Sequence, residues 1–170
     1  MKRIMVVGCG GTGKSTITKE LGKVLDIPIY HLDYYYWQPG WVPTPKKEWD
    51  EFVRELAAQP VWIIDGNFNR TMDIRLAKAD TVIFLDYSKW SCLYGVMKRR
   101  VMYHKRTRPD LNEGCPEKLD WEFIRWVWNF EKVQAPKLRA MFKRVEGKQI
   151  YHFKNRKQLQ NWVEDLSKKG

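Results

Sequence analysis

Residues Gly8-Cys-Gly-Gly-Thr-Gly-Lys-Ser15 fit the pattern G-x-x-x-x-G-K-[ST] at every fixed position. The glycines of this pattern let the backbone fold around a polyphosphate, with successive N–H groups pointing inward. Lys14 would supply a cation for the outer phosphates, and the Ser15 hydroxyl would be placed to ligate Mg²⁺. Typical residue frequencies give a chance match of about one in a hundred for a chain of this length. The stretch therefore predicts a phosphate-binding loop.

The sequence on either side of the loop has the context that such a loop requires. Residues 2–7 form a short, apolar and β-branched run suited to a buried strand. Residues 15–25 carry apolar side chains on one face of a helix, namely Ile17, Leu21, Val24 and Leu25. The N-terminus of this helix would direct its partial positive charge toward the phosphates.

Composition indicates a single domain over residues 1–170. The apolar run at the start of the chain is about four residues long, too short for a signal peptide. No apolar run approaches the roughly 20 residues of a membrane span. The three cysteines, Cys9, Cys92 and Cys115, include no C-x-x-C pair, which indicates free thiols and disfavours a zinc site. We therefore expect a cytoplasmic protein with no membrane partner.

The net charge of +11 is concentrated in the second half of the chain. Residues 1–86 hold 11 Lys/Arg and 11 Asp/Glu, so all of the excess lies in residues 87–170. Its densest part, residues 98–108, contains six cations and no acid. Such a cluster can bind the phosphates of a small ligand or follow a nucleic-acid backbone. A solvated helix face is the third interpretation.

Strands and helices alternate along the chain, which predicts an α/β fold with a parallel sheet covered on both faces. Thr44 is the expected N-cap of a helix that starts at Pro45, and Ser88 that of a later one. A further helix should run from Asp120 to about Phe130, and a last one carries its apolar face at 159–166. The expected strands span residues 2–7, 27–33, 61–65, 79–86 and 149–153.

Acidic residues end three of the expected strands and would face the ligand crevice. Asp65 follows an apolar run, as does the acid that holds Mg²⁺ in phosphoryl-transfer enzymes, although a capping or turn role is the alternative. Asp33 would accept the proton of an acceptor hydroxyl, or only bind that acceptor, or simply terminate the strand. Asp86 is interpreted as a cap or turn residue.

Two groups of aromatic residues lie in the chain. Tyr34-Tyr-Tyr-Trp37 and Trp41 could stack on a planar acceptor, or they could pack the crevice wall. Residues 121–130 carry a second group, which core packing or a partner interface explains better than a cofactor.

Five segments carry a family resemblance: residues 8–16, Tyr30-His-Leu-Asp33, Trp62-Ile-Ile-Asp-Gly-Asn67, residues 71–76 with 79–86, and Thr107-Arg-Pro-Asp110 with Glu113-Gly-Cys-Pro-Glu117. Together they resemble the bacterial DNA topology modulation protein family, and the resemblance covers nearly the whole chain. More distantly the chain is similar to adenylate kinase and to the kinases related to shikimate and gluconate kinases. The resemblance implies the strand order 2-3-1-4-5, the use of ATP and Mg²⁺, and a basic lid around residues 98–118.

Carried over to this chain, the resemblance places Asp65 near the metal, with Ser15 as a ligand. Arg99 and Arg100 match the lid arginines that grip phosphates, with Arg106 and Arg108 as further candidates. Asp65-Gly-Asn-Phe-Asn-Arg70 departs from the Asp-Gly-Phe-Pro-Arg of adenylate kinases, which puts AMP in doubt as the acceptor. The loop residues assigned to the phosphates are Gly8, Cys9, Gly10, Gly11, Thr12, Gly13, Lys14, Ser15 and Thr16.

Two functional hypotheses follow. In the first, the chain transfers phosphate from MgATP to a small acceptor, such as a nucleoside or nucleotide, with Lys14, Asp33, Arg99 and Arg100 as catalytic residues. In the second, it is a nucleotide-switched regulator that binds nucleic acid through its basic half. Cys9 would be either a small residue that fills the loop or a thiol whose oxidation blocks nucleotide entry.

Overall fold

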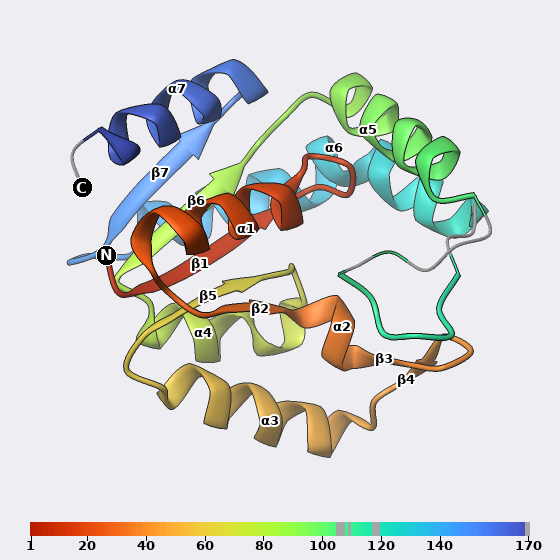
Figure 1. The fold of residues 1–170 in the computed structure, drawn as a ribbon, viewed down its shortest axis with the longest axis horizontal. Coiled ribbons are helices and arrows are strands. Elements are labelled where there is room, and N and C mark those ends of the chain that lie inside the picture. Colours follow the sequence, from red (N-terminus) through yellow and green to blue (C-terminus); the bar gives the residue numbers. More distant parts are fainter. Residues whose placement is uncertain (105–107, 109, 117–119, 169–170) are drawn as a thin grey trace.

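A five-stranded sheet forms the centre of the computed structural model (Figure 1), which describes residues 1–104, 108, 110–116 and 120–168. Its spatial order is β2-β5-β1-β6-β7, and every neighbouring pair is parallel. Numbered along the chain among these five strands alone, the order is 2-3-1-4-5, as predicted. The strands are β1 (Arg3–Gly8), β2 (Ile29–His31), β5 (Trp62–Asp65), β6 (Thr81–Leu85) and β7 (Gln149–Phe153).

Helices cover both faces of this sheet. Tyr151 and Phe153 of β7 contact Trp162 of α7, whereas Phe84 of β6 contacts Phe142 of α6 on the other face. Because both faces are covered, β1, β5 and β6 are apolar along almost their whole length. The helices are α1 (Lys14–Leu25), α2 (Leu32–Tyr36), α3 (Lys46–Ala58), α4 (Met72–Lys78), α5 (Lys89–Met102), α6 (Trp121–Lys143) and α7 (Arg156–Ser167).

Smaller elements complete the chain. A two-stranded hairpin of β3 (Trp37–Gln38) and β4 (Val42–Pro43) follows α2, and a 3₁₀ turn at Asn69–Thr71 precedes α4. Among the described residues, no helix combines the length and the apolar character that crossing a membrane would require. Arg106 and part of the expected lid at 98–118 lie outside the described residues.

Three expectations about local structure are wrong. The second strand ends at His31, and Asp33 lies in the first turn of α2 rather than at a strand end. Packing explains this turn, because the rings of Tyr35 and Tyr36 lie 4.9 and 5.0 Å from those of Phe52 and Trp49. These contacts favour the interpretation of this aromatic group as crevice wall.

The other two wrong expectations concern the ends of helices. Thr44 does not cap α3, because its hydroxyl donates to the carbonyl of Tyr36 at 2.8 Å and the N-cap is Pro45. α6 continues past Phe130 to Lys143, with Pro136 inside it. Burial of Leu138 and Phe142 in the core outweighs the hydrogen bond that the proline removes. Ser88 and Asp120 cap α5 and α6 as expected.

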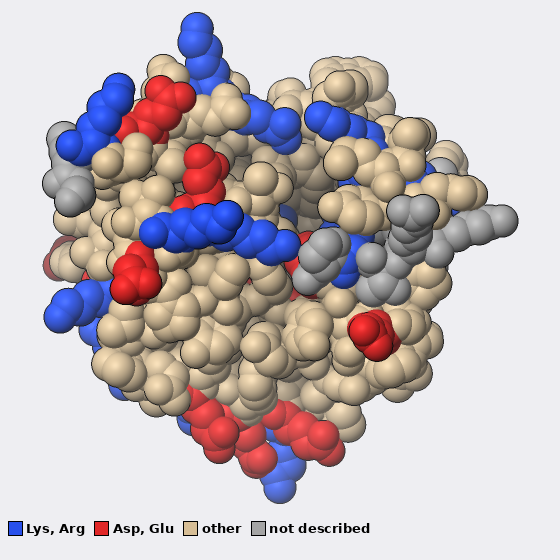
Figure 2. Space-filling view, viewed as in Figure 1, with Lys and Arg blue, Asp and Glu red and all other residues tan. Residues whose placement is uncertain are grey.

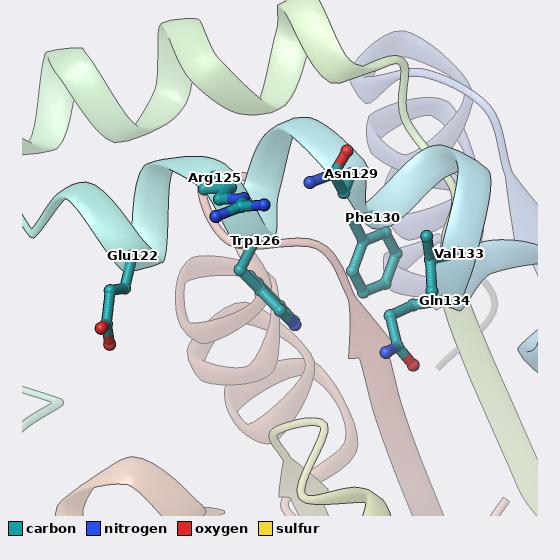
Figure 3. Close-up of a pocket in the computed structure, with 7 residues that line it drawn as sticks. All are labelled: Glu122, Arg125, Trp126, Asn129, Phe130, Val133 and Gln134. Carbon is teal, nitrogen blue, oxygen red and sulfur yellow. The ribbon is translucent and has the colours of Figure 1, made fainter.

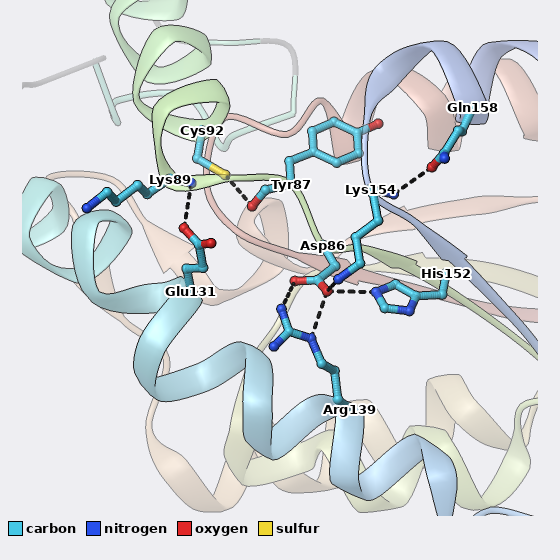
Figure 4. A network of polar contacts seen from close by, with 9 residues as sticks. All are labelled: Asp86, Tyr87, Lys89, Cys92, Glu131, Arg139, His152, Lys154 and Gln158. Carbon is cyan, nitrogen blue, oxygen red and sulfur yellow. Dashed lines mark hydrogen bonds and ion pairs between the residues drawn. The ribbon is translucent and has the colours of Figure 1, made fainter.

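Asp86 holds together the ends of β6, β7 and α6 (Figure 4). Its buried carboxylate accepts hydrogen bonds from Arg139 at 2.8 Å and from His152 at 2.7 Å, and it also pairs with Lys154. Burial alone would raise the pKa of Asp86, but the bonds from Arg139, Lys154 and His152 lower it to about 2. The residue is thus the centre of a charge network rather than a simple turn residue.

Replacing this carboxylate should destabilise the fold. We expect Asp86→Asn to lower the free energy of unfolding near pH 7, because it weakens the hydrogen bonds from the charged partners of Asp86. The loss should be limited to about 2 kcal/mol, because those partners are partly exposed and solvent screens their charges. Asp50→Asn, which removes one side of the exposed Asp50–Arg70 pair, should have a clearly smaller effect. Urea unfolding of the wild type and the two variants measures the loss of stability in each variant. An equal loss in the two variants would contradict the central role of Asp86.

The same network gives a pH dependence. The folded-state pKa of Asp86 is about 2, below the ordinary 3.8, so the stability that its carboxylate contributes is present above about pH 4. This stability is lost as the pH falls toward 2. The stability difference between the wild type and Asp86→Asn should therefore shrink between pH 5 and pH 2, as measured by unfolding at each pH. A constant difference across this range would be inconsistent with the lowered pKa.

Candidate functional site

The predicted phosphate-binding loop connects β1, the central strand, to α1. Gly13, in a left-handed conformation, is the N-cap of α1 and carries no side chain that could bond the first N–H groups of the helix. These N–H groups are the ones that a helix leaves without intrahelical partners, and they suit an anion. Cys9 is buried, and the Thr12 hydroxyl donates to the backbone carbonyl of Cys9 at 2.8 Å, which braces the loop. Thr16 is exposed on α1.

Asn67 fixes the start of the loop from the neighbouring strand β5. Its Oδ1 accepts from the N–H of Gly8 at 3.0 Å, and its Nδ2 donates to the carbonyl of Gly8 at 2.8 Å. The segment that carries Asn67 is held in turn by Arg75 of α4, whose fully buried guanidinium donates to the carbonyls of Gly66, Asn67 and Phe68. Burial lowers the pKa of Arg75 to about 9.

Helix α5 packs directly on the opposite side of the loop. A Cβ at Gly11 would lie 2.2 Å from the carbonyl oxygen of Cys92, and one at Gly95 would lie 2.0 Å from the carbonyl oxygen of Gly11. Both positions must therefore be glycine for the loop and the helix to approach this closely. This contact attaches α5, which carries the lid candidates Arg99 and Arg100, to the loop.

Lys14 lies along the loop in the position that the motif predicts. Its Nζ donates to the carbonyls of Gly8 and Cys9, both at 2.9 Å. Burial lowers the pKa of Lys14, although the negative charges of Asp33 and Asp65 oppose this effect. A half-buried ammonium held by neutral carbonyls is well placed to bind a phosphate, since charged phosphate oxygens would replace the weaker carbonyl partners.

Asp33 and Asp65 lie near Lys14, where β2 and β5 end. Burial raises the pKa of Asp33, while the charges of Arg108 and Lys14 act in the opposite direction. Asp65 is buried, and its Oδ2 accepts from His31 Nδ1 at 2.9 Å. Burial alone would lower the pKa of His31, but the bond and charge of Asp65 raise it. The Nε2 of His31 is buried without a hydrogen-bond partner among the described residues.

Ser15 bonds a residue that the sequence analysis did not assign to the site. The Ser15 hydroxyl donates to Oδ2 of Asp110 at 2.7 Å, and Arg108 Nη1 donates to the same oxygen at 3.2 Å. Burial would raise the pKa of Asp110, but the charge of Arg108 and the bond from Ser15 lower it. Asp110 and Arg108 are both buried, so the lid candidate Arg108 does lie in the site.

The lid candidates Arg99 and Arg100 occupy the last turn of α5 and are half-buried. The guanidinium of Arg99 lies 5.6 Å from the ring centre of Phe123, and its positive charge contributes to lowering the pKa of Lys14. The same ring contacts the loop, since a Cβ at Gly10 would lie 2.6 Å from Cζ of Phe123, so Arg99 lies near the loop.

The oxygen atoms of Ser15, Asp65 and Asp110 are the hard donors that Mg²⁺ prefers. Within the described part of the chain, no group of three or more His, Cys, Asp or Glu side chains could hold a metal ion without other ligands. Mg²⁺ typically takes one or two carboxylates and completes its shell with water and substrate phosphates. The residues present fit that arrangement.

A pocket lies elsewhere, along α6 (Figure 3). It has a volume of about 440 Å³ and contains none of the predicted site residues. Within the second aromatic group, Trp126 and Phe130 pack against each other 5.1 Å apart, whereas Trp121 is 80% exposed. Core packing thus accounts for part of this group.

Three signals bear on the residues that sequence reasoning missed. Asn67 stands directly after Asp65-Gly66 in a quoted motif, Arg75 interrupts the apolar face of α4 between Met72 and Leu76, and Asp110 is an acid next to a basic segment. None of these signals identifies the partner of the residue. Among the predicted residues, the loop, Asp33 and Asp65 lie at or just after the carboxyl ends of β1, β2 and β5.

No protein-family model matches this sequence, and no curated protein matches it either. Solved structures do. The shikimate kinase of Bacteroides thetaiotaomicron is 24% identical, with a TM-score of 0.54 and coverage of 98% of this chain and 97% of that one. A shikimate kinase of Acinetobacter baumannii, solved in complex with shikimate, is 16% identical, with a TM-score of 0.58 and coverage of 99% and 90%. The enzyme of Aquifex aeolicus is 18% identical, with a TM-score of 0.53 and coverage of 99% and 96%.

At these identities the likeness shows the fold. The chain has the five-stranded parallel sheet and surrounding helices of the P-loop kinases. The resemblance to the DNA topology modulation family stays a prediction.

Lys14 offers a direct test of the loop. Because its ammonium would exchange two neutral carbonyls for phosphate oxygens, Lys14→Ala should weaken MgATP binding about tenfold or more, with the fold intact. The matched control is Lys23→Ala, at an exposed lysine of the same helix, which should bind as the wild type does. Calorimetric titration measures both affinities. A folded Lys14→Ala protein with unchanged affinity would show that the loop does not bind phosphates in this way.

Proposed function

We propose that this protein is a kinase that transfers the γ-phosphate of MgATP to a hydroxyl group of a small molecule. The observation that carries the proposal is the position of Lys14, whose Nζ lies on the carbonyls of Gly8 and Cys9 inside the phosphate-binding loop. Asp33 and Arg99 are each close enough for their charges to affect the pKa of Lys14. A cationic group for the phosphates and a half-buried carboxylate for the acceptor are the two parts that phosphoryl transfer needs. The fold of the shikimate kinases supports this reading.

Each group has a defined task in the transfer. Lys14 and the N–H groups of the loop and of the first turn of α1 would bind the β- and γ-phosphates and orient them. The oxygen of the acceptor hydroxyl would form a bond to the γ-phosphorus as the bond between that phosphorus and the ADP oxygen breaks. Asp33 would accept the proton that this hydroxyl loses. Burial raises the pKa of Asp33, which makes the carboxylate a better base. Mg²⁺, held by Ser15 with Asp65 nearby, would neutralise phosphate charge.

Arg99 and Arg100 would act on the phosphoryl group in flight. Arginine side chains placed this way stabilise charge that spreads over the transferring group, and they act chiefly on the transition state. Arg99 lies against Phe123 near the loop, which restricts where its guanidinium can reach.

The nucleic-acid hypothesis finds no support in the comparisons. On the face shown in Figure 2, basic side chains are interspersed with uncharged ones, and acidic side chains gather at the lower edge, where α3 lies. Within the described part of residues 98–108, Arg99 and Arg100 are half-buried and Arg108 is buried. Arginine side chains that are buried or half-buried favour a small ligand over a duplex.

A screen for phosphate acceptors tests the proposal. Purified protein with labelled MgATP is offered nucleosides, nucleotides, sugars and other small hydroxyl compounds, and transfer to at least one is expected. Salt-dependent duplex binding without any transfer would favour the second hypothesis instead. Asp33→Asn should reduce transfer to the identified acceptor by at least tenfold, since a proton acceptor contributes about 10²–10⁴-fold.

Arg99→Ala should lower kcat by one or more orders of magnitude while the affinity for MgATP changes much less. Lys98→Ala is the matched control, because Lys98 is the exposed neighbour of Arg99 on the same helix. Steady-state kinetics and a separate binding titration measure the two quantities. Loss of affinity without loss of kcat would assign Arg99 to ground-state binding, and full turnover would remove it from the site.

A further inference from the structure

The metal-binding end of the phosphate loop contacts a carboxylate that comes from outside the sheet. The Ser15 hydroxyl donates to Oδ2 of Asp110 at 2.7 Å, across 95 residues of sequence. A hydroxyl that donates a hydrogen bond to a carboxylate keeps the lone pairs of its oxygen for a cation. The bond therefore fixes which way the Ser15 oxygen presents those lone pairs.

The strand-end acid has a different partner. Oδ2 of Asp65 is bonded to His31 Nδ1 at 2.9 Å, and it is Asp110 that accepts from Ser15. We propose that Asp110 is the positioning residue of the Mg²⁺ site, orienting the Ser15 oxygen toward the cation. This inference rests on the proposed function, which it deepens by naming the residue that orients the serine ligand of the metal.

Asp110 is held firmly enough for such a task. Arg108 Nη1 donates to the same oxygen as Ser15, at 3.2 Å, and both Arg108 and Asp110 are 8% exposed. A buried carboxylate between two donors has few alternative positions. Its orientation is thus set before any ligand binds.

Backbone contacts fix the segment that follows Asp110. The N–H of Gly40 donates to the carbonyl of Gly114 at 2.9 Å, and the thiol of Cys115 donates to the carbonyl of Gln38 at 3.2 Å. A Cβ at Gly114 would lie 3.0 Å from the Cβ of Pro39, so the two segments are in close contact. The β3–β4 hairpin therefore anchors the chain at Gly114 and Cys115, shortly after Asp110.

The test measures metal affinity rather than turnover. Mn²⁺ replaces Mg²⁺ in complexes with a non-hydrolysable ATP analogue, and free Mn²⁺ is followed by electron paramagnetic resonance. Asp110→Asn should weaken Mn²⁺ binding about tenfold or more, the range found when a residue that orients a metal ligand is replaced. Binding of the analogue without metal should change less than about threefold. The matched control is Glu113→Gln, at an exposed acid of the same segment, which should leave Mn²⁺ affinity as in the wild type.

A double variant separates positioning from general charge. If Asp110 acts through Ser15, then Asp110→Asn should add little to the loss that Ser15→Ala causes alone, because the group being oriented is gone. Additive losses, an equal loss in Glu113→Gln, or wild-type Mn²⁺ affinity in Asp110→Asn would each overturn the inference. Should Asp110→Asn fail to fold, Arg108→Met/Asp110→Asn removes both charges together and is expected to show the same loss.

The failure of this inference differs from the failure of the proposed function. A wild-type protein that binds no MgATP analogue at all would refute the kinase. A wild type that binds the metal–analogue complex and transfers phosphate, with Asp110→Asn unchanged in Mn²⁺ affinity, would refute only the role of Asp110.

Discussion

The phosphate-binding loop is held from two sides, and the rest of the site depends on this constraint. On one side the amide of Asn67 bonds both the N–H and the carbonyl of Gly8. On the other, Gly11 touches the backbone of α5. A glycine-rich segment has much conformational freedom to lose, so these contacts supply the order that the loop cannot supply for itself. Lys14 and Ser15 are placed only because the backbone before them is fixed.

The parallel sheet then decides which other side chains reach the loop. With β1 in the centre, the ends of β5 and β6 flank it and β2 lies one strand further out. Asp65 therefore arrives directly beside the loop, whereas Asp33 needs the turn into α2 to approach it. The buried Arg75 contributes by holding the carbonyls after Asp65 in place, a task that no apolar residue could perform.

Local signals in the sequence predicted the parts of this arrangement that depend on local physics. The loop, its flanking strand and helix, the caps Ser88 and Asp120 and the last strand at 149–153 all follow from spacing and residue type, and the structure confirms them. Helix α6 was predicted too short, because burial of Leu138 and Phe142 is decided by the sheet beneath them. The pairing of Ser15 with Asp110 could not be predicted from spacing, since nothing local links residues so far apart.

Gly95 has a consequence for how the molecule folds. A glycine inside a helix costs about 1 kcal/mol relative to alanine, so α5 is intrinsically weaker than its length suggests. The helix recovers this stability by resting on the loop, where no larger residue would fit. The two elements should therefore become ordered as one cooperative unit, and a ligand that rigidifies the loop would slow amide hydrogen exchange along α5 as well.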